Sequence, residues 1–225
     1  MRTVASLYES SVGKKIAMAL SGVLLIGFVV GHMVGNLKVY QGRDAFNHYA
    51  EGLRIFGAPF FAQGQVLWII RVTLLLAVGI HIAAAAQLTV ASRRARRTGY
   101  RRFDSLAFSY ASRTMVWGGL IILLFIVYHL MHLTIGNAHP DFVPGDAYHN
   151  FVAGFHSVPV AVAYIAAMIP LGLHLYHGTW SLFQTLGANN PRYNRYRRPL
   201  AAAIAILVVA GNVSFPLAVL AGVVA

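Results

Sequence analysis

The stretch LLFIVYHLMHLTIG (residues 123–136) is mostly apolar, but it carries His129 and His132 near the end of a run long enough to cross a membrane. A histidine in hydrocarbon is costly, so ionisable residues inside a span are rare and indicate function by default. Hydrophobic residues make up 58% of the chain and charged residues 11%, whereas a soluble domain carries roughly 25% charged residues. The sequence therefore predicts an integral membrane protein in which some partner stabilises these imidazoles.

Five apolar runs reach the length of about 20 residues that a membrane-spanning helix needs. We expect a single all-α membrane domain over residues 1–225, with transmembrane helices at about 16–36, 65–91, 110–135, 156–183 and 199–222. The segment DAFNHYAEGLRIFG (44–57) is predicted to form a short helix near the outer surface. Because no connection is long enough for a soluble catalytic domain, the chemistry must lie within the spans or at their ends.

The net charge of +12 comes from basic residues that cluster in alternate connections between the apolar runs. This is the pattern of the positive-inside rule, and it places the N-terminus in the cytoplasm and the C-terminus outside. It does not indicate nucleic-acid binding. The chain has no cysteine, which excludes disulfides, ligation of iron–sulfur clusters and covalently attached haem.

Six histidines lie inside or near the ends of the first four runs, and four of them, one from each run, lie at two depths. At a rise of about 1.5 Å per residue, His32 and His129 lie in the outer third of the membrane, and His81 and His174 lie in the inner third. Two facing histidines at one depth can hold one b-type haem through both axial positions, so two layers would hold two stacked haems in the bundle of the first four helices. Bis-histidine ligation leaves no open iron position, which favours electron transfer over oxygen chemistry.

Two choices stay open at this point. His129 and His132 lie on one helix face, as do His174 and His177, and each pair differs in depth by only about 4.5 Å. A single intramembrane histidine is also commonly a hydrogen-bond partner between helices rather than a ligand. We expect His48, His139 and His149 to lie solvated in outer loops.

Four stretches carry a resemblance to a known family: MALSGVLLIGFVVGHMVGNL (18–37), GIHI (79–82), SRTMVWGGLIILLFIVYHLMHLT (112–134) and GLHLYHGTWSLFQTLG (172–187). They resemble the single-polypeptide, five-helix diheme cytochrome b that anchors succinate dehydrogenase and fumarate reductase in the cell (inner) membrane. The resemblance implies that His32 with His129 holds the outer haem, and His81 with His174 the inner haem. It favours His174 over His177 because Gly178 follows four residues later.

The resemblance also implies partners that this sequence does not itself encode. A flavoprotein subunit and an iron–sulfur subunit would bind on the cytoplasmic side, where succinate and fumarate are interconverted as in the tricarboxylic acid cycle. This chain would carry electrons between the iron–sulfur subunit and a quinone in the membrane lipid, with menaquinone as one choice.

Further residues are candidates for contacts with the cofactors. The haem propionates need cationic or hydrogen-bonding partners. Our candidates near the haems are Arg113, Arg71, Ser21, His177 and Lys38, with the alternatives that the cations anchor the chain at the membrane surface and that Ser21 bonds a backbone carbonyl. Our candidates for the quinone site are Glu51, His48 and Trp68 on the outer side and Trp180 on the inner side.

Two other functions compete with this prediction. A diheme cytochrome b subunit of a formate dehydrogenase or hydrogenase would keep both haems and change the partner. A haem-free transporter would use the histidines as a proton relay, but the spans contain few other polar residues to line a substrate path.

Overall fold

The computed structural model describes residues 8–95, 110–188 and 190–225, with the side chains of residues 110–113 excepted. All regular structure in this part of the chain is helical. The elements are α2 (Ser11–Asn36), η1 (Leu37–Gln41), α3 (Arg43–Ile55), α4 (Gln65–Ala95), α5 (Tyr110–His129), η2 (Leu130–Ile135), α6 (Ala147–His156), α7 (Val158–Thr185) and α8 (Pro191–Leu220).

In the described residues, five helical segments are long and apolar enough to cross a membrane, which confirms the five predicted spans and indicates a multi-pass membrane protein. Their ends differ from the prediction in places. The last helix begins at Pro191 rather than near residue 199, because Asn190 caps it by accepting a hydrogen bond from the Arg192 N–H at 2.8 Å. Proline at the first helical position fits this start, since its missing N–H would be unbonded there anyway.

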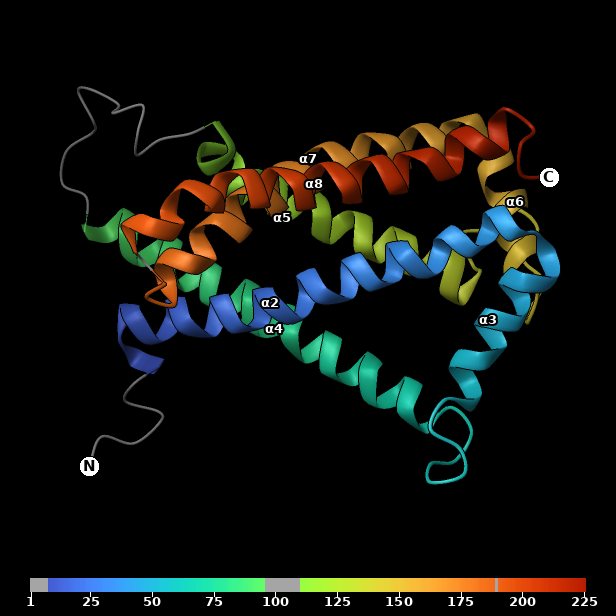
Figure 1. Ribbon diagram of the computed structural model, residues 1–225, viewed down its shortest axis with the longest axis horizontal. Helices are drawn as coiled ribbons and strands as arrows, with labels where there is room; N and C mark the ends of the chain where they lie inside the picture. The colour runs from blue at the N-terminus through green and yellow to red at the C-terminus, as the bar shows by residue number, and fades with distance from the viewer. Residues whose placement is uncertain (1–7, 96–109, 189) are drawn as a thin grey trace.

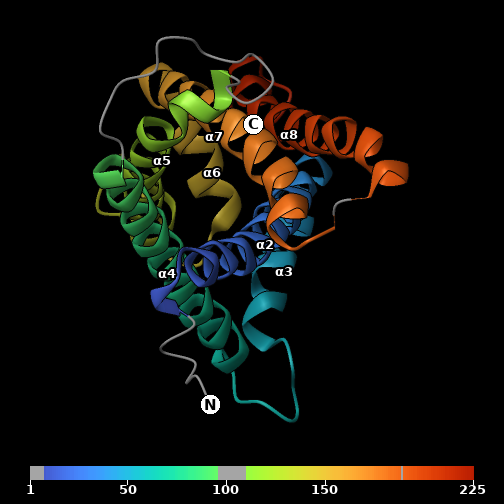
Figure 2. The same cartoon turned by 90° about the vertical axis from the view of Figure 1, so that its left-hand side faces the viewer.

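The spans α2, α4, α5 and α7 surround a common axis, and α8 lies outside this ring against α7 and α2 (Figure 2). Around the ring, α2 packs along α4, and α5 packs along α7. The pairs α2 with α5 and α4 with α7 therefore face each other across the diagonals (Figure 2). A side chain that points inward from one helix meets its counterpart on the opposite helix.

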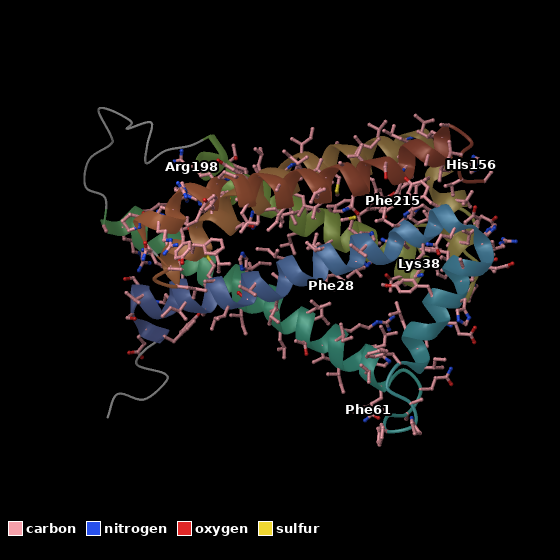
Figure 3. All side chains as sticks on the ribbon, in the orientation of Figure 1. Phe28, Lys38, Phe61, His156, Arg198 and Phe215 are labelled. Carbon is pink, nitrogen blue, oxygen red and sulfur yellow. The ribbon has the colours of Figure 1, made fainter. Side chains whose placement is uncertain are left out.

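The two ends of the bundle differ in charge and in cover (Figure 1). At one end, called the basic end, α2 and α8 begin and α4 and α7 end. Its described basic residues are Lys14, Lys15, Arg93, Arg94, Arg192, Arg195, Arg197 and Arg198. The other end, called the capped end, carries η1, α3, η2 and α6 together with Asp44, Glu51, Asp141 and Asp146. Arg198 marks the basic end, and Lys38 and His156 mark the capped end (Figure 3).

The helix α3 confirms the short outer helix predicted over residues 44–57. The helix α6 was not predicted, because residues 147–155 were assigned to a loop. The Asp146 side chain caps α6 by accepting from the His149 N–H at 3.0 Å. The same carboxylate accepts from Asn47 at 2.9 Å and pairs with Arg43 at 3.0 Å, so it ties α3 to α6.

The main core lies under these two short helices. Its aromatic members come from α3, α6, α7 and α8 and are Phe46, Tyr148, Phe151, Phe155, Tyr164 and Phe215. A smaller core around Leu175, Ala205 and Val208 joins α7 to α8 further along the bundle. By contrast, α4 buries only Ala77 and Ala84. The protein itself therefore covers α4 and α5 less completely than α7 and α8.

Candidate functional site

Two pairs of histidines meet across the diagonals of the ring. The rings of His32 on α2 and His129 at the end of α5 lie with their centroids 5.9 Å apart. The rings of His81 on α4 and His174 on α7 lie 6.0 Å apart. We call the first the capped-end pair and the second the basic-end pair.

The spacing of both pairs fits one metal atom held between two imidazoles. An imidazole nitrogen lies about 2 Å from a bound transition metal, so two rings on opposite sides of one metal have centroids about 6 Å apart. Among the described residues there is no group of three or more histidine, aspartate and glutamate side chains that could hold a bare metal ion. Two imidazoles at this spacing could hold the two axial positions of a haem, whose macrocycle supplies the other ligands.

In the basic-end pair, the backbone of α2 orients His81. Its Nδ1 lies 3.1 Å from the Met18 carbonyl oxygen, so the ring N–H donates to the backbone there. This leaves the lone pair on Nε2, as in metal-binding histidines whose second nitrogen is hydrogen-bonded. The Nδ1 atom of His174 is buried, and within the described part of the chain it has no hydrogen-bond partner.

In the capped-end pair, side chains orient both rings. Phe28 stacks on His32 at 5.3 Å, and the Asn36 amide nitrogen lies 3.3 Å from His32 Nε2. Nε2 of His32 therefore presents its lone pair to the amide, and a metal bound at Nε2 would replace the amide contact. The Tyr164 hydroxyl lies 3.3 Å from Nδ1 of His129, which leaves Nε2 of His129 for a ligand.

Space around the pairs comes from glycines and from incomplete cover. The His32 side chain is exposed although its ring faces the bundle axis. A Cβ on Gly22 would lie 3.5 Å from the His81 ring, and one on Gly119 would lie 3.9 Å from the His174 ring. An apolar recess of about 230 Å³ between α5 and α7, lined in part by Gly118 and Pro170, also reaches His174. The residues present thus leave some room beside the imidazole rings.

A second histidine cluster lies behind the capped-end pair. His132, in the π-helical turn η2, is completely buried, and its Nδ1 lies 3.0 Å from the Tyr164 hydroxyl. Its ring stacks on His139 at 4.8 Å and on Tyr128 at 5.5 Å. Since His132 is enclosed by these rings, the structure places His129 rather than His132 opposite His32.

The prediction that His139 and His149 lie solvated in loops is only partly right, because His139 does lie in a loop but neither residue is fully exposed. His139 is partly buried, and its Nε2 donates to the Asn150 carbonyl oxygen at 2.7 Å. His149 lies in α6 and contacts the Asp141 carboxylate at 3.0 Å. Both differences from the prediction arise because the connection before α7 forms α6, which packs against η2, α7 and α8. His48, in α3, is exposed as expected.

The candidate polar contacts of the haems lie at different places. Ser21 is buried, and its hydroxyl donates to the Ala17 carbonyl oxygen at 2.8 Å, which is the backbone alternative considered above. Lys38 lies in η1 with its Nζ 5.9 Å from the centre of the Tyr49 ring. Arg71 is exposed on α4 and lies 5.1 Å from the Trp68 ring. Arg113 belongs to α5, but its side chain lies outside the described residues.

His177 follows His174 by one turn, and its ring meets that of Trp180 at 5.9 Å. Its Nδ1 is buried and, in the described part of the chain, has no hydrogen-bond partner. The ring nearest to His81 is that of His174 at 6.0 Å, which agrees with the choice that the resemblance implies.

The quinone candidates fall into two groups that the fold keeps apart. Glu51 and His48 are exposed on α3, and Trp68 is exposed at the start of α4, beside α3. Trp180 lies toward the basic end with Arg198 5.3 Å from its ring. A hollow of about 480 Å³ at the capped end is lined instead by Arg43, Tyr148, His149, Val152, Ala153, His156 and Ala225.

Sequence reasoning missed Tyr164, which lies in an apolar run with no pattern that distinguishes it.

Comparison of this chain with protein-family models, with curated proteins and with solved structures gave no match. The fold and the site define the class by themselves: a multi-pass membrane protein whose described part has five apolar helices of spanning length and two imidazole pairs across one ring of four helices.

Proposed function

We propose that the chain is the diheme cytochrome b anchor of a succinate:quinone oxidoreductase, carrying electrons between an iron–sulfur subunit and membrane quinone. The observation that supports this most strongly is the pair of diagonal histidine contacts at 5.9 and 6.0 Å. In this proposal His32 and His129 hold one b haem, and His81 and His174 hold the other. Each haem, when bound, supplies one-electron transfer.

The chain's own residues hold and orient the ligands. The Met18 carbonyl and the Tyr164 hydroxyl each lie against an Nδ1, on His81 and His129 respectively. An acceptor at Nδ1 fixes the tautomer and the ring direction, and it raises the basicity of the ligating Nε2. The apolar spans exclude water, which leaves the axial ligands and their hydrogen bonds as the main control of redox potential.

The choice of partners rests on the resemblance of the four histidine-bearing stretches and on charge. The basic end gathers Lys14, Lys15, Arg93 and Arg94 with the arginines of α8. By the positive-inside rule this end faces the cytoplasm, with the N-terminus inside and the C-terminus outside. The flavoprotein and iron–sulfur subunits would dock there, in the cell (inner) membrane of the host.

Electrons would leave or enter through a quinone such as menaquinone. A quinone site needs an apolar slot and a hydrogen-bond donor to a quinone carbonyl. Near the capped end, His48, Glu51 and Trp68 provide polar and aromatic groups on neighbouring elements. Trp180 with His177 is the corresponding choice toward the basic end.

An optical redox titration of the purified protein tests the proposal. We expect the spectrum of low-spin b haem and two titrating centres, with two haems per chain by pyridine haemochrome assay. A colourless protein, or a single high-spin haem, would contradict it. The histidines would then be more consistent with a relay in a transporter.

The partner is tested by isolating the chain with its complex from native membranes. Succinate should reduce both haems in this preparation, and formate or hydrogen should not. Reduction by formate or hydrogen alone would support a diheme cytochrome b. It would assign the chain to a formate dehydrogenase or hydrogenase in place of succinate dehydrogenase.

A further inference from the structure

Tyr164 connects the capped-end pair to the buried histidine cluster. It lies on α7 and is 7% exposed, and its ring packs against Phe125 at 5.0 Å and Phe155 at 4.8 Å. Its hydroxyl oxygen lies 3.3 Å from Nδ1 of His129 and 3.0 Å from Nδ1 of His132. One hydroxyl therefore serves two imidazoles, only one of which faces the bundle axis.

Hydrogen-bond accounting limits how these three groups share protons. A tyrosine hydroxyl has one hydrogen to donate, and a neutral imidazole carries one N–H and one lone pair. If both contacts are hydrogen bonds and the phenol hydrogen is used in one of them, one Nδ1 donates to the phenol oxygen and the other accepts the phenol hydrogen. The chain of bonds has a direction, and reversing it exchanges the tautomers of both histidines.

Because His129, as a ligand through Nε2, carries its proton on Nδ1, His132 is assigned as the acceptor of the phenol hydrogen, and its own buried Nε2–H then has no partner in the described part of the chain. Nδ1 of His132 is also the nearer of the two imidazole nitrogens to the hydroxyl, at 3.0 Å against 3.3 Å for His129. The neighbouring ring of His139 is fixed, because its Nδ1 accepts from the Asp141 N–H at 3.0 Å and its Nε2 donates to Asn150 at 2.7 Å. His139 thus does not compete for the phenol hydrogen.

We propose that Tyr164 is a positioning residue for the capped-end haem: its hydroxyl, engaged by His132, accepts the Nδ1–H of His129 and directs the Nε2 lone pair of His129 toward His32. The proposal rests on the proposed function, since it assigns His129 as a ligand of haem iron. It gives His132 a role behind the ligand and not on the iron. Hydrogen bonds in such a chain polarise one another, so the phenol becomes a better acceptor for His129.

The basic-end pair provides an internal reference. There the Nδ1 of His81 donates to a backbone carbonyl, which no side-chain substitution removes. A change at Tyr164 should therefore alter one haem and leave the other unchanged. A general loss of packing or of membrane integrity would instead affect both.

The test compares Tyr164→Phe with Tyr128→Phe in the full protein. Tyr128 stacks on His132 and meets the Tyr164 ring at 5.9 Å, but in the described part of the chain its hydroxyl bonds neither histidine. Without the hydroxyl as acceptor for its Nδ1–H, His129 donates less electron density to the iron through Nε2. Tyr164→Phe should therefore shift the capped-end haem to a more positive midpoint potential. The basic-end haem, and both haems of Tyr128→Phe, should keep the wild-type potentials. His132→Phe should give a smaller shift in the same direction, because it removes only the acceptor of the phenol hydrogen.

The ring nitrogen resonances of ¹⁵N-labelled His129 give a second readout that does not need haem. The wild-type chain should show the Nδ1–H tautomer, and Tyr164→Phe should show a mixture. Two intact haems with unchanged potentials and an unchanged tautomer in Tyr164→Phe would overturn the proposal while leaving the diheme function in place. A wild-type protein without haem would instead contradict the proposed function, and the tautomer would still decide the role of Tyr164.

Discussion

The two histidine pairs have the same spacing but are supported differently. The capped-end pair is oriented by the side chains of Phe28, Asn36 and Tyr164. In the basic-end pair, His81 is oriented through the backbone of α2, at the Met18 carbonyl, and Nδ1 of His174 has no hydrogen-bond partner in the described part of the chain. A ligand held by a side chain can be tuned or lost by a single substitution elsewhere. A ligand held by the backbone depends mainly on the helix itself.

The two ends also differ in packing. Behind the capped-end pair lie the cluster of His132 and His139 and an aromatic core covered by α3 and α6. Beside the basic-end pair there are glycines and a recess between α5 and α7. Changes in volume should therefore be tolerated less well at the capped end.

The largest effect is expected from removing one ligand at a time. His81→Ala should abolish the basic-end haem and leave the capped-end haem, and His129→Ala should do the reverse. Optical redox titration of each variant distinguishes the remaining centre. His156→Ala, an exposed histidine at the end of α6, is the control and should keep both centres. Retention of both haems in His81→Ala would count against the pairing.

The difference in packing is tested by adding one methyl group at the capped end. A Cβ on Gly154 would lie 2.7 Å from Cε1 of His132 and 3.0 Å from Nε2 of His139. Neither ring can yield easily because they stack on each other, so Gly154→Ala should cost about 1–3 kcal/mol of stability through overpacking. Thermal unfolding in detergent measures this loss of stability.

Gly52→Ala in α3 is the matched control, because no atom lies within 4 Å of its added Cβ. This half-buried helical site should gain about 0.5–1 kcal/mol from helix propensity. Equal stability of the two variants would mean that the histidine cluster is loosely packed.

A smaller effect is expected at the link between α3 and α6. The His149 N–H and the Asn47 amide, together with Arg43, hold the pKa of Asp146 below its usual value of 3.8. A lowered pKa means that this carboxylate stabilises the fold fully above the usual value, and that the contribution is lost as pH falls through the lower, folded-state pKa. Asp146→Ala should cost about 1 kcal/mol at neutral pH through loss of the helix cap.

Asp146→Asn separates the cap from the charge. Asparagine caps helices about as well as aspartate, so this variant should keep most of the neutral-pH stability and lose the acid dependence. Thermal unfolding as a function of pH measures both variants. An unchanged acid dependence in Asp146→Asn would assign it to other carboxylates.

The smallest effect is expected from Ser21→Ala beside the basic-end pair. The Ser21 hydroxyl lies 3.3 Å from His81 Nδ1, but its hydrogen goes to the Ala17 carbonyl, and His81 keeps its own bond to Met18. The loss should be below about 1 kcal/mol, with no change in the potential of the basic-end haem. A clear shift of that potential would show that the hydroxyl, and not the backbone, orients His81.

Much of the fold could be predicted from apolar length and charge. Each span must bury about 20 residues in hydrocarbon, so the count of five spans follows directly from the sequence and agrees with the structure. The helix α6 was missed because its ten residues, Ala147–His156, mix polar and apolar side chains and carry no membrane signal. Its start depends on the cap by Asp146, and its position depends on contacts with α3 and α8.

The candidate site, too, could be predicted from the sequence only in part. Depth along a helix follows from the number of residues and the rise per residue, so the sequence by itself determined that four histidines lie at two levels. The tertiary structure alone shows that these levels lie on the diagonals of one ring, that His132 is enclosed behind Tyr164, and that His139 is partly buried. The physical reason is that rotation about each helix axis, and the choice of facing neighbours, are set by packing between distant segments.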